Sequence, residues 1–277
     1  MTPNTVQLRL RVFALAITLA SFARSADALD GRAAFATIRF GVVGTVSSGA
    51  PSGGGFSATQ IAPSWAVTAA HIAPAVGLSF RNDFGNSTVA EILSFPTRAP
   101  TDSPLPGALR DDLVLVRLAA PIHALYLPQL ADDATFLSRA SPGLALTLVS
   151  NNPDAAHRRY GAAELAGVFN RIGYPLVVSI GKQLDVVRGD SGSALFLGRI
   201  KDANASSVLI GVASAQGSTA QGQSFGVYTR IGAYRAALDA AVAASGETLN
   251  WATPPLPSLP PLSRSAGEGP GVRATQP

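Results

Sequence analysis

The chain of 277 residues carries 47% hydrophobic and only 14% charged side chains, enough apolar material for a sizeable core in one large domain or two small ones. Its formal net charge is +4, and no run of Lys and Arg with interleaved aromatic residues occurs, so the sequence gives little support to a nucleic-acid partner. Cysteine is absent, which excludes disulfide bonds and thiolate metal sites.

The first 28 residues have the pattern of a secretory signal peptide. Arg9 and Arg11 precede an apolar run at residues 12–20, and small residues follow as far as Ala28, where we expect cleavage. The run is too short for a membrane-spanning helix and no later segment qualifies, so we expect no stable membrane anchor in the cleaved protein. Cleavage removes three arginines and one aspartate and lowers the net charge from +4 to +2. The sequence predicts a secreted or periplasmic protein, and export without cysteine suits a bacterial periplasm or the extracellular space.

Short apolar runs rich in β-branched and aromatic residues recur between residues 29 and 250, separated by clusters of Gly, Pro, Asn, Asp and Ser. We expect strands at residues 35–43, 56–61, 65–71, 89–95, 113–118, 144–149, 176–180, 194–197, 208–212 and 225–230. A helix is expected at residues 234–245, where Tyr234, Leu238 and Val242 share one face and Gly246 follows as a stop. The pattern predicts an all-β fold, a sandwich or a barrel, with one late helix.

Residues 251–277 are crowded with Pro and Gly and hold hardly any core-forming side chains. This composition predicts a disordered tail, to which the sequence assigns no function.

Three short motifs, called islands below, contain candidate catalytic residues, and they follow one another in the order His, Asp, Ser. His71 ends one apolar run, Asp112 opens another, and Ser191 stands in Gly-Asp-Ser-Gly at residues 189–192. Taken singly, each island also fits a structural histidine, a capping aspartate or a simple turn. Taken together, they supply a hydroxyl nucleophile, an imidazole base and a carboxylate that orients the base.

These islands resemble the trypsin/chymotrypsin-like serine protease family. The resemblance covers about residues 33–246 and rests on Ala-Val-Thr-Ala-Ala-His at 66–71, Asp-Leu-Val-Leu-Val-Arg-Leu at 112–118, Gly-Asp-Ser-Gly-Ser-Ala-Leu at 189–195 and Gly-Val-Tyr-Thr-Arg at 226–230. It implies two packed six-stranded antiparallel β-barrels in residues 29–250, with the boundary near 120–140 and a C-terminal helix. It also implies a serine endopeptidase that needs no metal or organic cofactor and acts on protein or peptide substrates.

The resemblance implies roles for individual residues. His71 resembles the general base, Asp112 its orienting carboxylate and Ser191 the nucleophile, while Gly189 and Ser191 match the oxyanion-hole positions.

Substrate-binding positions are implied in the same way for Asp185, Ser214, Gln216 and Gly226. Ser214 lies in a segment that resembles the strand pairing with the substrate backbone, and Gln216 replaces a glycine that keeps the pocket open in the family. Asp185, six residues before Ser191, matches the base of the primary specificity pocket, where a carboxylate favours Arg or Lys at the cleaved residue. A surface loop position is an equally good interpretation of Asp185.

The start of the mature chain departs from the family pattern. There a freed N-terminal ammonium, in an Ile-Val-Gly-Gly segment, pairs with the acid before the serine. In this chain the acid before the serine is Asp190. No Ile-Val-Gly-Gly segment is recognisable, and the similar Val42-Val43-Gly44-Thr45 is expected to be an internal strand. A buried carboxylate without a partner is costly, so the partner of Asp190 is left open.

Other functions were weighed against the protease. The α/β-hydrolases have the order Ser, acid, His, and Ser193 stands where their second motif glycine would be; a subtilisin-like order lacks an acid island before His71. His123 and His157 lie in loop-like segments without metal-ligand spacing. The alternative that stays open is a catalytically silent binding protein with the protease fold.

Overall fold

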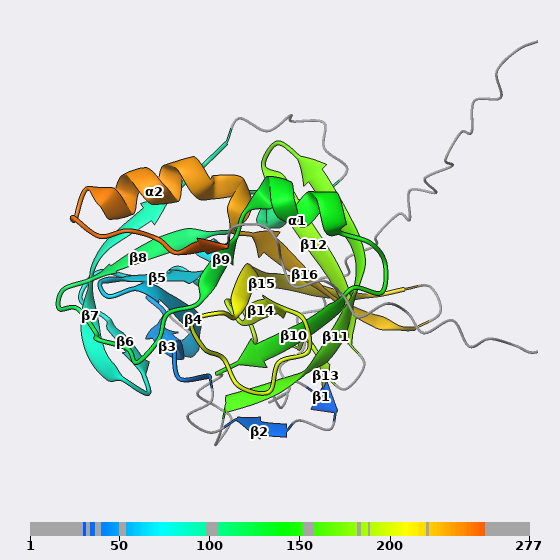
Figure 1. Cartoon of the computed structure of the whole chain (residues 1–277), viewed down its shortest axis with the longest axis horizontal. Helices are drawn as coiled ribbons and strands as arrows, with labels where there is room; N and C mark the ends of the chain where they lie inside the picture. The colour runs from blue at the N-terminus through cyan, green and yellow to red at the C-terminus, as the bar shows by residue number, and fades with distance from the viewer. Residues whose placement is uncertain are drawn as a thin grey trace, which may run out of the picture.

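The computed structural model describes residues 30–31, 34–36, 40–49, 54–97, 105–151, 158–181, 184–187, 189–219 and 222–252. The expected signal peptide and residues 253–277 of the expected tail lie outside these residues. Within them the protein is mostly β and contains two closed six-stranded antiparallel barrels, which lie side by side in Figure 1. This confirms the coarse prediction of an all-β, two-barrel fold.

The first barrel closes in the order β3-β4-β5-β8-β7-β6. β6 alternates exposed and buried positions because one of its faces lines the barrel core, whereas β5 is buried along its whole length. Val46, Phe80 and Val116 belong to this core. The bounds are β3 (Val43–Ser47), β4 (Gly55–Ala62), β5 (Trp65–Thr68), β6 (Ser79–Asn82), β7 (Gly85–Ser94) and β8 (Val114–Leu118).

The second barrel runs in the order β14-β10-β11-β12-β16-β15 and closes where β15 pairs with β14. Leu146, Val177 and Tyr228 belong to its core. The bounds are β10 (Ala145–Ser150), β11 (Arg158–Arg171), β12 (Tyr174–Gly181), β14 (Ala194–Leu197), β15 (Val208–Ser218) and β16 (Ser224–Arg230).

Short elements complete the described part of the chain. β2 (Ala34–Ala36) pairs with β11, β1 (Asp30–Gly31) pairs with β13 (Leu184–Asp185), and β9 (Gln129–Ala131) pairs in parallel with β15 and with β17 (Trp251–Ala252). The helices are α1 (Asp133–Arg139) and α2 (Arg235–Ala243), and the 3-10 turns are η2 (Ala70–Ile72), η3 (Gly107–Leu109) and η4 (Gly232–Tyr234). No helix in these residues is both long and apolar enough to cross a bilayer.

A third body of apolar side chains joins the two barrels. Phe40 and Trp65 from the first half of the chain pack in one cluster with Phe196 of β14 and with Leu238 and Val242 of α2. The helix therefore buries its apolar face between the barrels and lies over β5 and β8 in Figure 1. The Nε1–H of Trp65 donates to Ser245 Oγ at 2.9 Å, which fixes the end of the helix to the first barrel.

The expected helix at 234–245 is present as η4 followed by α2, and Gly246 adopts a left-handed φ of +78° after its last turn. The expected strand at 35–43 was wrong as a single element: β2 and β3 are separate, and Phe40 to Val42 lie in a turn. Phe40 and Val42 are apolar because they fill the core between the barrels, which a strand pattern cannot distinguish.

The longest strand, β11, was not predicted. It is rich in Ala and Gly and lacks the β-branched run that marks the other strands, and only its tertiary pairing with β10 and β12 fixes it as a strand. The expected strand at 65–71 ends at Thr68 and continues as η2. The expected tail begins too early, because Trp251 and Ala252 pair with β9.

Candidate functional site

The structure brings three of the predicted site residues into contact. The Nε2 atom of His71 lies 2.7 Å from Ser191 Oγ, and its Nδ1 atom lies 2.8 Å from Asp112 Oδ2. His71 and Asp112 come from the first barrel and Ser191 from the turn before β14 of the second. The three side chains therefore form one continuous hydrogen-bonded chain across the junction of the barrels.

His71 is held by both its backbone and its ring. The buried strand β5 ends at Thr68, Ala69 is extended, and η2 carries His71 through one tight turn that ends at Ala73 in a left-handed conformation. The backbone N–H of His71 donates to Asp112 Oδ1 at 2.9 Å, while the ring contacts the other carboxylate oxygen. The side chain is 37% exposed, so the imidazole is fixed and still accessible from solvent.

Asp112 is 2% exposed and fully engaged as an acceptor. Besides the two bonds to His71, its Oδ2 accepts a very short hydrogen bond from Ser214 Oγ. An ionised carboxylate can only accept, so the proton of the His71 ring is assigned to Nδ1 and Nε2 is left to accept from the Ser191 hydroxyl. This is the tautomer in which the imidazole can remove a proton from serine.

The turn that carries Ser191 needs its glycines. Gly189 and Gly192 have φ values of +97° and +79°, which L-residues rarely adopt. A Cβ atom at position 192 would lie 2.0 Å from the carbonyl oxygen of Ser57 and 2.3 Å from Thr68 Oγ1. The turn is therefore pressed against β4 and β5 of the first barrel, close to the segment that leads to His71.

The backbone of the same turn leaves two donors unused by the rest of the described chain. The N–H groups of Asp190 and Gly192 donate to the carbonyls of Val187 and Ala213, at 3.1 and 2.8 Å, whereas those of Gly189 and Ser191 have no hydrogen-bond partner among the described residues. Two such donors flanking a hydroxyl can bind an anionic oxygen.

Asp190 is fully buried, and its donors include two groups of the second barrel. Ser150 Oγ donates to its Oδ1 at 2.7 Å and the backbone N–H of Val187 to its Oδ2 at 3.0 Å. Ser57 Oγ lies 3.4 Å from the Ser150 hydroxyl, so a hydroxyl of the first barrel extends the network. Some of the hydrogen-bond partners of Asp190, which the sequence did not identify, are thus side-chain and backbone groups of the same chain.

The expected substrate-binding residues lie in different surroundings. Ser214, expected on the strand beside the substrate, turns its hydroxyl to Asp112. Gln216 is exposed on β15 and pairs in register with Gly226 of β16. Gly226 is buried, and a Cβ atom there would lie 2.7 Å from Val186 Cγ2.

Asp185 lies in β13, where its backbone pairs with that of Asp30. Its role at the base of a specificity pocket stays a prediction, as does the surface alternative.

Sequence reasoning missed Ser150 and Tyr234 as neighbours of the site, because each is an isolated residue in a core strand or helix and only the fold brings it near. Asp111, which directly precedes Asp112, was not among the predicted site residues, yet its carboxylate has its own set of partners. His123 is exposed, His157 lies outside the described residues, and the described residues contain no group of three or more His, Cys, Asp or Glu that could hold a metal ion.

No protein-family model matches this chain, and no curated protein matches it.

Proposed function

We propose that the protein is a serine endopeptidase of the trypsin/chymotrypsin-like type. The observation that carries the proposal is the continuous chain from Ser191 Oγ through the His71 ring to the buried Asp112 carboxylate, with distances of 2.7 and 2.8 Å. A turn or a capping interaction would explain any one of these residues, but neither requires all three to meet in this order. The two antiparallel barrels, with the chain lying across their junction, agree with the family resemblance of the sequence.

The geometry suits acyl transfer from a peptide bond. Ser191 Oγ attacks the carbonyl carbon while its proton passes to His71 Nε2, and Asp112 stabilises the imidazolium that results. The carbonyl oxygen becomes an anion, and the N–H groups of Gly189 and Ser191, which have no partner among the described residues, would donate to it.

The second half of the reaction reverses these transfers. The imidazolium gives its proton to the leaving amine, and the acyl group remains bound to Ser191 Oγ as an ester. Water then gives a proton to His71 Nε2 as it attacks the ester, and the proton returns to Ser191 when the acid product leaves.

Two observations bear on specificity. Asp185 would favour Arg or Lys at the cleaved residue if its carboxylate lies in the substrate pocket. Val186, the next residue, is buried and approaches Gly226 closely, which narrows the space beside this glycine. Hydrolysis of peptides that differ only in having Arg, Phe or Ala at the cleaved residue separates the effect of Asp185 from that of Val186. Equal rates with all three peptides would mean that Asp185 does not set the specificity.

The experiment that tests the proposal is labelling with a fluorophosphonate probe and hydrolysis of casein by the protein without residues 1–28. We expect the label on Ser191, located by peptide mass spectrometry, and loss of both label and hydrolysis in Ser191→Ala. Ser138→Ala, which changes an exposed serine of α1, is the matched control and should keep both. A folded protein that takes no label and cleaves nothing would instead be the silent binding protein.

We also propose that the protein is exported and that its partners are protein or peptide substrates. The support is the pattern of residues 1–28 described above. Intact mass of protein recovered from the periplasm or medium should correspond to cleavage after Ala28, and an uncleaved cytoplasmic product would contradict this.

A further inference from the structure

Asp111, next to the Asp112 carboxylate of the proposed triad, is a buried acid that the proposed reaction does not use. Its side chain is 8% exposed, and that of Asp112 is 2% exposed. Two successive buried carboxylates are costly unless each has its own hydrogen-bond donors. The partners of Asp111 therefore indicate what its burial achieves.

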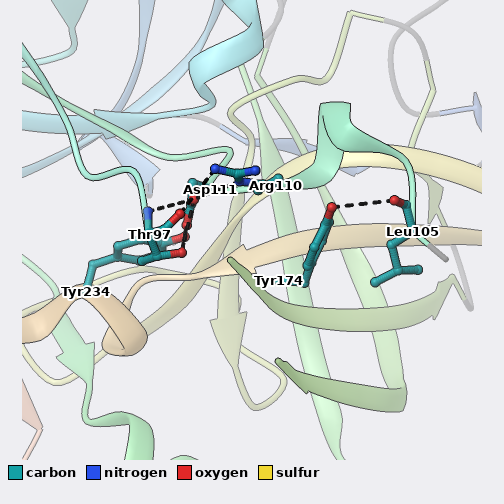
Figure 2. Close-up of polar contacts among 6 residues, drawn as sticks. All are labelled: Thr97, Leu105, Arg110, Asp111, Tyr174 and Tyr234. Carbon is teal, nitrogen blue, oxygen red and sulfur yellow. Dashed lines mark hydrogen bonds and ion pairs between the residues drawn. The ribbon is translucent and has the colours of Figure 1, made fainter. Parts of the chain in front are cut away.

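The Asp111 carboxylate gathers donors from two distant segments (Figure 2). The backbone N–H of Thr97 donates to Oδ2 at 2.8 Å, and the Thr97 hydroxyl donates to Oδ1 at 2.8 Å. The Tyr234 hydroxyl donates to Oδ1 at 3.0 Å. Arg110, which is 40% exposed, adds a looser contact of 3.6 Å between its Nε and Oδ2.

The backbone of Asp111 is also fixed. Its φ is +47°, in the left-handed region that aspartate and asparagine enter more readily than most residues. Its N–H donates to Gly173 O at 2.8 Å, and its carbonyl accepts from the N–H of Leu113 at 2.8 Å. As a result of this turn the two successive carboxylates share no hydrogen-bond partner among the described residues: Asp112 contacts His71 and Ser214 instead.

Two of these contacts, with the Gly173 carbonyl and with the Tyr234 hydroxyl, lead from the first barrel to the second half of the chain, whereas those with Thr97 stay within the first half. Asp111 and Asp112 lie just before β8 of the first barrel, separated from it by Leu113, whereas Gly173 lies between β11 and β12 of the second barrel and Tyr234 lies in η4 after β16. Near the start of the same segment, the Tyr174 hydroxyl donates to Leu105 O at 3.5 Å, as Figure 2 shows. The segment at 105–112 is thus attached to the second barrel at both ends.

The Tyr234 hydroxyl remains protonated, and so remains a donor to Asp111, at ordinary pH. Burial, followed by the charge of the neighbouring Asp111, raises the pKa of the Tyr234 hydroxyl well above its ordinary value. The hydroxyl therefore keeps its proton over the whole range in which proteins are normally active.

We infer that Asp111 is a positioning residue, which attaches the segment carrying Asp112 to the second barrel and so sets the His71–Asp112 pair against Ser191. The inference rests on the proposed function. Ser191 belongs to the second barrel, so its distance from His71 depends on how firmly the acid and the base of the first barrel are attached there. If the His71–Asp112 pair moves away from Ser191, the rate of the chemical step falls more than the affinity for substrate.

Two substitutions at position 111 separate position from charge. Asp111→Ala removes every side-chain contact, and we expect kcat to fall about 10- to 100-fold, with KM changing less than about 3-fold. Asn can direct its oxygen to the Thr97 N–H and its NH₂ group to the two hydroxyls, which can also accept, and it tolerates the left-handed φ. Asp111→Asn should therefore keep kcat within about 3-fold of the wild type. The low-field NMR signal of the proton shared by His71 Nδ1 and Asp112 should be shifted or lost in Ala and kept in Asn.

Tyr234→Phe removes one donor and no bulk, so it tests the same attachment even if Asp111→Ala does not fold. We expect a smaller fall in kcat than for Asp111→Ala, again without a matching rise in KM. The control is Asn204→Ala, which removes an amide oxygen that accepts from the Ser206 N–H at 2.8 Å in the exposed loop between β14 and β15. It should lower the melting temperature slightly while leaving kcat and the NMR signal unchanged.

The outcomes distinguish the inference from the proposed function. A wild-type protein without label or hydrolysis would end the proposed function, and with it the inference. An active wild type whose Asp111→Ala variant keeps both kcat and the NMR signal would overturn the inference alone. Equal losses in Asp111→Asn and Asp111→Ala would also overturn it, because the charge of Asp111 would then matter and not its attachment.

Discussion

Gly192 offers the sharpest test of how closely the two barrels approach at the site. Gly192→Ala places a methyl group 2.0 Å from Ser57 O and 2.3 Å from Thr68 Oγ1, and both atoms lie in the first barrel. An L-residue in the left-handed region costs about 1–2 kcal/mol, and overpacking in a close-packed region adds about 1–3 kcal/mol. We therefore expect the free energy of unfolding to fall by about 3 kcal/mol, or the melting temperature by about 6–12 °C for a domain of this size.

Gly198→Ala is the matched control for this substitution. Gly198 has a φ of +83°, close to the +79° of Gly192, but no atom lies within 4 Å of the position that its Cβ would take. Alanine there should carry only the backbone cost of about 1–2 kcal/mol. Urea unfolding of both variants, followed by tryptophan fluorescence, measures the difference, and peptide hydrolysis should be lost only in Gly192→Ala because the Ser191 turn must move. Equal stability losses in the two variants, with activity kept in both, would refute the close approach.

Two further predictions concern hydroxyl groups near the site. Ser150→Ala removes a hydrogen-bond donor from the fully buried Asp190 carboxylate, so we expect the free energy of unfolding in urea to fall by about 1–3 kcal/mol and kcat to fall with it. Ser150→Thr should restore both quantities. An alanine variant as stable as wild type would mean that other donors satisfy this carboxylate. The pKa of Tyr234 is raised above its ordinary value of 10.0 in the folded protein, so its contribution to stability is fully present below that pH and is lost as the pH rises beyond it. The stability difference between wild type and Tyr234→Phe should thus be constant below about pH 10 and shrink as the pH rises above it, and a difference that stays constant above that pH would contradict the burial of this hydroxyl.

The sequence predicted the parts of the fold and site that follow from local pattern. Short apolar runs rich in β-branched and aromatic residues identified most strands, and the late helix followed from Tyr234, Leu238 and Val242 on one face. The order and surroundings of His71 and Ser191 marked residues that the structure brings into contact.

The parts that escaped prediction depend on contacts between distant segments. β11 has a weak intrinsic preference for the extended state and is fixed by its neighbours in the barrel. Ser150 meets Asp190 across 40 residues of sequence, and Tyr234 meets Asp111 across 123. No local pattern signals such pairs, because a single serine or tyrosine in an apolar run is compatible with many surroundings.

The contacts between the C-terminal segment and the first barrel affect the order in which the protein can fold. Trp65 meets Ser245 across 180 residues, and the backbone N–H of Ser64 meets the Glu247 carboxylate across 183. A chain still being synthesised or exported can pair the strands of its first barrel, but it lacks the helix that covers them and the tyrosine that holds Asp111. Contacts of such long range form late and slowly. The protein would therefore acquire its complete site only after nearly all of its described length has emerged, which delays any activity until the rest of the chain has folded.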